Sequence, residues 1–82
     1  MAFDAVAYKE TTRQQWQDAA EAWNAWGVFL DAWLGPATET MLDMAGIGPG
    51  SHVLDVAAGA GQQSLTAARR VGAAGRVLAT DI

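Results

Sequence analysis

The sequence contains no cysteine and little positive charge, and both absences narrow what the chain can do. Without cysteine there is no disulfide framework and no thiolate metal site, which fits a reducing compartment. Five Lys and Arg residues stand against nine Asp and Glu residues, and the formal net charge is −4. Only Arg69 and Arg70 are adjacent, and we expect this pair on a solvated helix face. Nucleic-acid surfaces require clustered basic residues, so we expect no nucleic-acid partner.

No segment of the sequence predicts a secretion signal, a membrane span or a metal site. The first ten residues, MAFDAVAYKE, lack a basic stretch followed by an apolar one. The most apolar run, Trp23 to Leu34, is interrupted by Asn24 and Asp31 and is too short to cross a bilayer. The single histidine, His52, has no cysteine or second histidine to complete a ligand set. We therefore expect a soluble, cytoplasmic chain.

Helical patterns dominate the first half of the chain, after a leader of ten residues that we expect to be loosely held. Thr12 and Gln15 have the spacing of a capping box, which predicts a helix from about Arg13. This helix is expected to run to Gly35-Pro36, where a second one begins. The second helix is predicted over residues 36–45, with a glycine at residue 46 to end it. Residues 1–50 would then form a helical lead-in or cap.

Large aromatic residues recur along the predicted first helix. At about 100° per residue, five apolar side chains fall within an arc of roughly 100°; they are Trp16, Trp23, Trp26, Leu30 and Trp33. Such a stripe is most often packed in a core; a helical lid over a ligand is the less frequent alternative. Left uncovered, it would favour self-association. Gly27, inside the same segment, indicates a bend.

The second half reads as one β-α-β unit over residues 51–82. HVLDVA and RVLAT are short apolar runs between turn signals, which predicts two strands buried on both faces. A helix is expected between them from Gln62 to Val71, and a connection of this length makes the strands parallel. Two parallel strands are too few for a stable sheet, so the pattern predicts the opening part of a larger α/β domain.

A glycine loop joins the first strand to the helix. Gly59 and Gly61 permit a tight turn and the approach of a ligand to backbone N–H groups, although tight β-to-α turns use glycine for geometry alone. Asp81 follows Gly59 by 22 positions, close to the spacing of about twenty at which an acid meets ribose hydroxyls. Ser64 stands where dinucleotide-binding loops have a third glycine.

Asp55, four residues before the loop, decides between ligands. A buried carboxylate needs a partner, which is either a protein donor or a cationic ligand. It would repel the pyrophosphate of a dinucleotide across a low-dielectric site. An adenosine ligand with a ribose for Asp81 and a positive charge near Asp55 is S-adenosyl-L-methionine, which carries a sulfonium and an ammonium group.

The segments HVLDVAAGAGQQS and GRVLATDI together resemble the class I S-adenosylmethionine-dependent methyltransferases, and especially the group that includes quinone-biosynthesis methyltransferases. The resemblance covers His52 to Ile82 well and extends more loosely back to Thr12. It implies an α/β fold in which N-terminal helices precede a Rossmann-like sheet of seven strands. This chain carries the first two strands, so it would be an N-terminal portion of such an enzyme.

The resemblance also implies which residues hold the cofactor. The loop glycines, Gly59 and Gly61, would lie along its methionine part, and Asp55 would help to hold its amino end. Asp81 would bond the ribose hydroxyls, with Ile82 near the adenine. The last of the six implied cofactor residues is Ala57, directly after the first strand, where many family members have a glycine.

These patterns predict a methyltransferase fragment whose catalytic residues the sequence does not identify. The methyl acceptor is expected to be a small apolar or aromatic molecule, and the chain alone is expected to be inactive. Two alternatives stay open. One is a fragment of an NAD- or FAD-binding domain, which Asp55 and Ser64 disfavour. The other is a non-enzymatic helical module that binds a partner, or a second copy, through its tryptophans.

Overall fold

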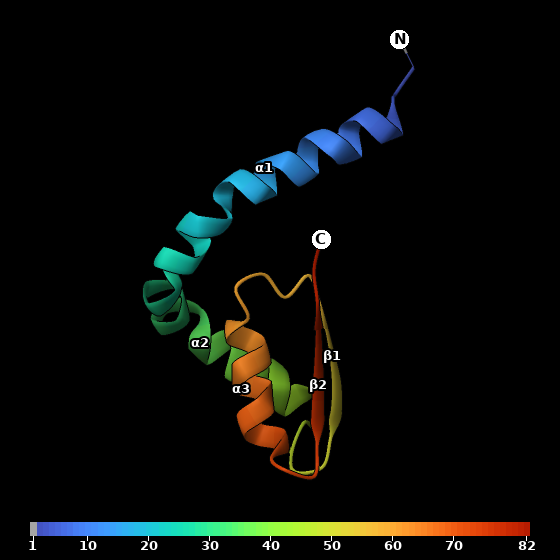
Figure 1. The fold of residues 1–82 in the computed structure, drawn as a ribbon. Helices are drawn as coiled ribbons and strands as arrows, with labels where there is room; N and C mark the ends of the chain where they lie inside the picture. Colours follow the sequence, from blue (N-terminus) through green and yellow to red (C-terminus); the bar gives the residue numbers. More distant parts are fainter. Residues whose placement is uncertain (1) are drawn as a thin grey trace.

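The computed structural model describes residues 2–82, which fold into three helices and a two-stranded parallel sheet (Figure 1). In chain order the elements are α1 (Ala5–Ala25), α2 (Gly27–Met44), β1 (His52–Val56), α3 (Gln62–Val71) and β2 (Arg76–Thr80). α2 and α3 lie together on one side of the sheet, whereas α1 extends away from it as an arm. No helix within residues 2–82 is both long and apolar enough to cross a membrane.

α1 begins earlier than the sequence predicted. Asp4 caps it: its Oδ1 accepts hydrogen bonds from the N–H groups of Val6 (3.1 Å) and Ala7 (3.0 Å). An aspartate in this position satisfies N–H groups that have no partner within the helix. The expected loose leader and the start near Arg13 were therefore wrong, because the capping signal at Asp4 takes effect two turns before the one at Thr12.

The boundary between the first two helices lies at Trp26, not at Gly35-Pro36. Trp26 has φ −90° and ψ 8°, and the chain resumes helical geometry at Gly27. Gly27 is buried, and a Cβ there would collide with the side-chain amide of Gln62. The bend expected at Gly27 is thus confirmed, and α3 packs against it. Pro36 lies inside α2, which continues through it although proline supplies no N–H for the helix.

The β-α-β unit is confirmed with nearly the predicted bounds. β1 and β2 pair in parallel, with Val53 opposite Val77 and Asp55 opposite Ala79. α3 packs on the face that carries these residues. The most buried apolar side chains lie where α2 and α3 meet and cover that face; they are Leu42, Ala67 and Val71. This small core holds the sheet to the helices.

The two strands are buried on one face, not on both as predicted. Leu54 and Leu78 are each 63% exposed and Val56 is 70% exposed, all on the face turned away from α3. Apolar runs of this kind are typical of parallel strands covered on both sides. The apolar runs therefore predicted the strands, but within residues 2–82 only one face of the sheet is covered.

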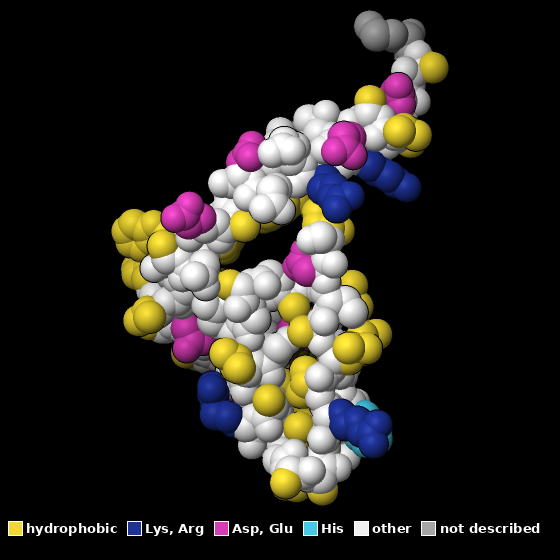
Figure 2. All heavy atoms as spheres, viewed as in Figure 1, with side chains coloured by type: hydrophobic (Ala, Val, Ile, Leu, Met, Phe, Trp, Pro, Cys, Tyr) yellow, Lys and Arg dark blue, Asp and Glu magenta, His cyan; other side chains and the backbone are white. Residues whose placement is uncertain are grey.

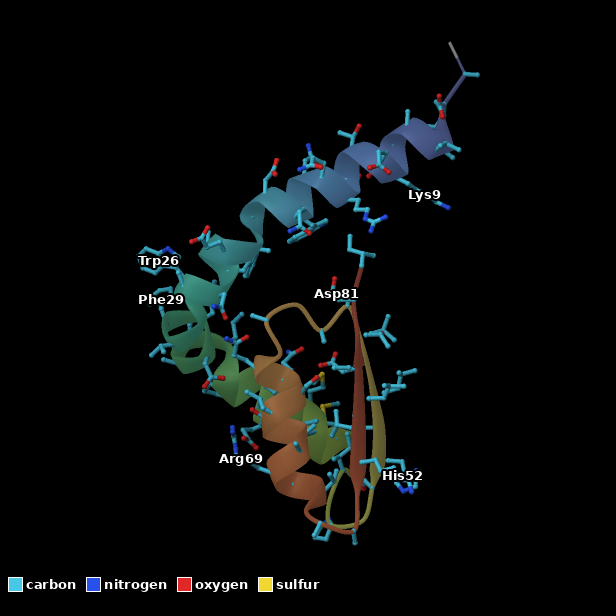
Figure 3. All side chains as sticks on the ribbon, in the orientation of Figure 1. Lys9, Trp26, Phe29, His52, Arg69 and Asp81 are labelled. Carbon is cyan, nitrogen blue, oxygen red and sulfur yellow. The ribbon has the colours of Figure 1, made fainter. Side chains whose placement is uncertain are left out.

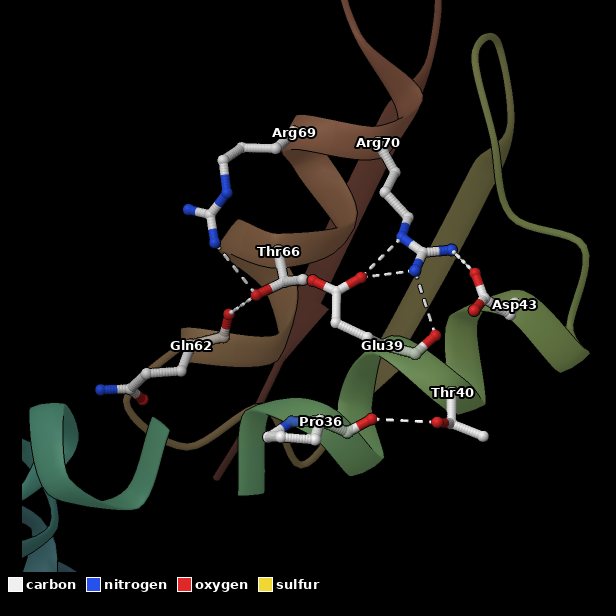
Figure 4. Close-up of polar contacts among 8 residues, drawn as sticks. All are labelled: Pro36, Glu39, Thr40, Asp43, Gln62, Thr66, Arg69 and Arg70. Carbon is white, nitrogen blue, oxygen red and sulfur yellow. Dashed lines mark hydrogen bonds and ion pairs between the residues drawn. The ribbon is translucent and has the colours of Figure 1, made fainter. Parts of the chain in front are cut away.

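Arg70 joins α3 to α2 across the covered side (Figure 4). Its guanidinium makes ion pairs with Glu39 and, at 2.6 Å, with Asp43, and it also donates to the main-chain oxygen of Glu39 at 3.0 Å. The Arg70 side chain is only 22% exposed. The hydrogen bonds that its guanidinium donates to Glu39 and, second, to Asp43 raise the pKa of Arg70 above its ordinary value. We expected both Arg69 and Arg70 on a solvated helix face, and this was wrong for Arg70. Its guanidinium N–H groups bind two carboxylates on α2.

Gly75 supplies the first stability test. A Cβ at this position would lie 2.7 Å from the carbonyl oxygen of Ser51 and would also meet the side chain of Val71. We expect Gly75→Ala to lower the free energy of unfolding by about 1–3 kcal/mol, as overpacking in a tight site does. Urea denaturation followed by circular dichroism at 222 nm measures the change.

Gly48→Ala is the matched control, because nothing lies within 4 Å of a Cβ at Gly48 and its φ is not positive. We expect it to change stability little. Equal effects of the two substitutions would contradict the packing that the structure gives Gly75.

Candidate cofactor site

A cleft of about 1010 Å³ separates the arm of α1 from the edge of the sheet. One wall comes from α1 and the start of α2, and the other from the loop after β1 and the end of β2. Figure 2 shows the hollow between the arm and the rest of the molecule. The cleft therefore lies where the sequence predicted a cofactor, at the carboxyl edge of two parallel strands.

The parallel register brings the glycine loop to Asp81. Both strands end at this edge, and the loop begins by pairing with β2: the N–H of Ala58 donates to the carbonyl of Thr80 at 2.9 Å. One residue further along each segment, the N–H of Gly59 donates to Oδ2 of Asp81 at 2.6 Å. Figure 3 shows Asp81 at the end of β2, beside the loop. Two residues separated by 22 positions thus meet at the mouth of the cleft.

The Asp81 carboxylate has two backbone donors and capacity to spare. Its Oδ1 accepts from the N–H of Ile82 at 2.7 Å, and its Oδ2 is bonded by Gly59. A carboxylate offers about four acceptor sites, so two remain for hydroxyl donors from a ligand. The residue is exposed, which leaves these sites accessible from the cleft.

Asp55 lies below the loop and not in the cleft wall. Its side chain is half-buried on the α3 side of the sheet, and its Oδ2 accepts a hydrogen bond of 2.6 Å from the hydroxyl of Ser64. Of the two partners that the sequence left open for Asp55, the structure shows the protein donor, which is the hydroxyl of Ser64. The bond ties β1 to the first turn of α3, across the glycine loop, and so fixes the two ends of that loop.

The structure brings four of the six predicted cofactor residues to the cleft: Ala57, Gly59, Asp81 and Ile82. Asp55 and Gly61 are not among the residues that line it. Gly61 has φ +92° and stands at the N-cap of α3, where a left-handed backbone is needed to turn the chain into the helix. Gly61 therefore serves the geometry of the turn, which is one of the two interpretations that the sequence left open.

Ala57 has a positive φ of 60°, the one such value at a non-glycine residue within the described chain. The left-handed region costs a residue with a Cβ roughly 1–2 kcal/mol. The backbone of Ala57 thus takes a conformation that glycine favours. Its Cβ is therefore accommodated as local strain beside the cleft.

The tryptophan stripe is divided by the break at Trp26. Trp16, Trp23 and Leu30 line the cleft, whereas Trp26 and Trp33 do not. Trp26 and Trp33 each pack against Phe29: the ring centroid of Phe29 lies 6.1 Å from that of Trp26 and 6.5 Å from that of Trp33. Trp26 and Phe29 lie on the outside of the bend in Figure 3. The prediction of a single stripe was wrong because it assumed one uninterrupted helix.

Several residues of the cleft were not predicted as site residues. Arg13 and Asn24 reach it from α1, and Asp31 from α2. Gln62 packs on Gly27, and Gln63 donates to the hydroxyl of Thr38 at 3.3 Å. Arg13, Asn24 and Asp31 carried no signal in the sequence, because exposed helices contain such residues everywhere and their orientation toward the cleft depends on the bend. Gln62 and Gln63 begin the helix after the glycine loop, but glutamine is equally an ordinary helix former.

Comparison of the chain with protein-family models, with curated proteins and with solved structures finds no match. Within residues 2–82 no three or more His, Asp or Glu side chains gather closely enough to hold a metal ion. We therefore infer a function from the sequence and from the geometry of the cleft.

Replacement of Ala57 by glycine tests the strain beside the cleft. We expect Ala57→Gly to raise the free energy of unfolding by about 1 kcal/mol, because glycine adopts a positive φ without the Cβ penalty. Ala58→Gly is the control: Ala58 has no positive φ, so glycine there should lower stability by about 0.5–1 kcal/mol. Urea denaturation of the two variants should give changes of opposite sign, and changes of the same sign would argue against strain at Ala57.

Proposed function

We propose that the chain is the cofactor-binding part of an S-adenosyl-L-methionine-dependent methyltransferase with a class I, Rossmann-like sheet. The observation that carries this proposal is the bond between the Gly59 amide and the Asp81 carboxylate at the mouth of the cleft. It joins a glycine loop to a strand-end acid at a carboxyl edge of parallel strands, where α/β sheets bind adenosine ligands. The resemblance of HVLDVAAGAGQQS and GRVLATDI to this family supports the same function.

The charges at the edge favour S-adenosylmethionine over a dinucleotide. A pyrophosphate binds glycine loops through free backbone N–H groups. Here the Gly59 N–H is engaged by a carboxylate, and a second carboxylate, Asp55, lies under the loop. Two negative groups oppose a phosphate and attract a ligand that carries sulfonium and ammonium charges.

In this proposal each residue has a limited task. Asp81 would accept hydrogen bonds from the ribose hydroxyls, and Ile82 would lie against the adenine. Gly59, which has no side chain, would let the methionine part lie close to the loop, and the Asp55–Ser64 bond keeps the loop in register with α3. When bound, the cofactor would supply an activated methyl group for direct displacement by a nucleophile, with S-adenosylhomocysteine as the leaving group. Much of the rate of such a transfer comes from alignment of donor and acceptor.

A second function is favoured by the outer aromatic cluster, defined as Trp26, Phe29 and Trp33. Each of its side chains is more than half exposed. Exposed aromatic clusters often mark protein contact sites. The cluster would suit a helical interaction module, and it does not line the cleft, so both functions could belong to one chain.

Titration calorimetry with S-adenosylhomocysteine tests the proposed function. We expect binding that Asp81→Asn weakens roughly ten- to hundred-fold, as the loss of a charged hydrogen-bond partner does. NAD should bind more weakly than S-adenosylhomocysteine.

Asp18→Asn is the matched control, because Asp18 is an exposed acid on α1 that accepts from Gln14 and does not line the cleft. It should leave affinity unchanged. Tighter binding of NAD, or equal affinity of the Asp81→Asn and unmodified chains for S-adenosylhomocysteine, would overturn the proposal.

A further inference from the structure

We propose that the α1 wall of the cleft is the acceptor subsite, and that it takes a planar aromatic molecule with an anionic group such as a carboxylate. The acceptor role of this subsite rests on the proposed methyltransferase function. Its ligand chemistry rests on the aromatic wall and on Arg13, the basic residue that lines the cleft.

The wall presents two indole rings to the cleft. Trp16 and Trp23 are seven residues apart, two turns along one face of α1, and their ring centroids are 6.2 Å apart with an interplanar angle of 39°. Each ring is about half exposed, so each has a free face. Leu30 and Leu34 continue this apolar surface from α2. A flat, rigid apolar surface of this kind complements an aromatic ring, which stacks on it with little loss of conformational entropy.

One basic and two acidic side chains line the cleft. Arg13, one turn before Trp16, is the one Lys or Arg residue that lines the cleft in residues 2–82. It makes no ion pair with any described residue, since the ion pairs in this part of the chain all belong to Arg70. Asp31 and Asp81 also line the cleft. An anionic ligand group is attracted to Arg13 and repelled by the two acids.

Arg13 would hold the anionic group of the acceptor. A guanidinium offers a planar fork of donors that matches a carboxylate. With its anionic group at Arg13, the molecule stacks its ring on Trp16 and Trp23, on the wall across the cleft from the glycine loop. Arg13 is then a specificity-determining residue and takes no part in bond making.

The outer aromatic cluster lacks this combination. Trp33 is 68% exposed, and neither it nor Phe29 lines the cleft. In the view of Figure 2 no Lys or Arg side chain lies at the bend, where the cluster is found. The cluster therefore provides a comparison in which aromatic surface is present without a neighbouring cation.

Titration calorimetry with two probes tests the inference. The full chain is titrated with 2-naphthoate and with 2-naphthalenemethanol, which differ mainly in charge, with and without saturating S-adenosylhomocysteine. We expect naphthoate to bind about three- to five-fold more tightly than the alcohol, the range of a partly exposed ion pair. Arg13→Gln should abolish this preference, and Trp23→Leu should weaken both probes by about ten-fold, as the loss of one stacking partner does.

The controls are Lys9→Gln, one turn away on α1, and Trp33→Leu, on the outer aromatic cluster; neither residue lines the cleft. Both should leave probe binding unchanged. Equal affinity for the two probes, a loss in Trp33→Leu as large as in Trp23→Leu, or displacement of naphthoate by S-adenosylhomocysteine would overturn the acceptor subsite. Naphthoate binding that depends on Arg13 and Trp23, in a chain that does not bind S-adenosylhomocysteine, would preserve the ligand chemistry and remove the methyltransferase role.

Discussion

The parallel pairing of β1 with β2 is the constraint on which the cleft depends. In an antiparallel pair the residues that follow the two strands would emerge at opposite ends, whereas here both emerge at one edge. The carbonyl of Thr80 then receives the N–H of Ala58, and the next residues along, Gly59 and Asp81, meet through a hydrogen bond. A shift of one strand by one residue would also turn its inward valine, Val53 or Val77, away from α3. The small core between α2, α3 and the sheet therefore holds the geometry of the site as well as the fold.

The second wall of the cleft has a different origin, in the break at Trp26. α1 has no buried residue, so its own packing contributes little to its position. Its direction is set where it joins α2, and Gly27 allows Gln62 of α3 to lie against that junction. Gln62 is also the first residue of α3 and follows the glycine loop. The junction of the two long helices and the loop are thus in contact through one side chain, and a change at either one reaches the other.

Local patterns in the sequence were enough to predict the β-α-β unit and much of the site edge. Turn signals and short apolar runs predicted β1, α3 and β2 nearly residue by residue, because glycine-containing turns separate these elements. The spacing of Gly59 and Asp81 predicted that both belong to the site, whereas their direct hydrogen bond was not predicted. The helical half was harder. Helix breaks depend on tertiary contacts, and neither the packing of Gln62 on Gly27 nor the tolerance of Pro36 within α2 has a local signal. The position of each α1 residue relative to the cleft depends on the break at Trp26, so the sequence did not predict Arg13 as a residue of the site.

Asp55 connects the fold to the proposed chemistry in an unexpected way. The sequence offered a protein donor or a cationic ligand as its partner, and Ser64 is a protein donor. A protein donor and a cationic ligand are compatible partners, because a carboxylate has two oxygens and in the described structure Ser64 binds one of them, Oδ2. Ser64 replaces the glycine that lets a helix approach its strand closely in dinucleotide-binding loops. The same substitution that disfavours a dinucleotide thus supplies the bond that fixes the loop, and it leaves the negative charge of Asp55 beneath the place where the proposed ligand would carry its positive charge.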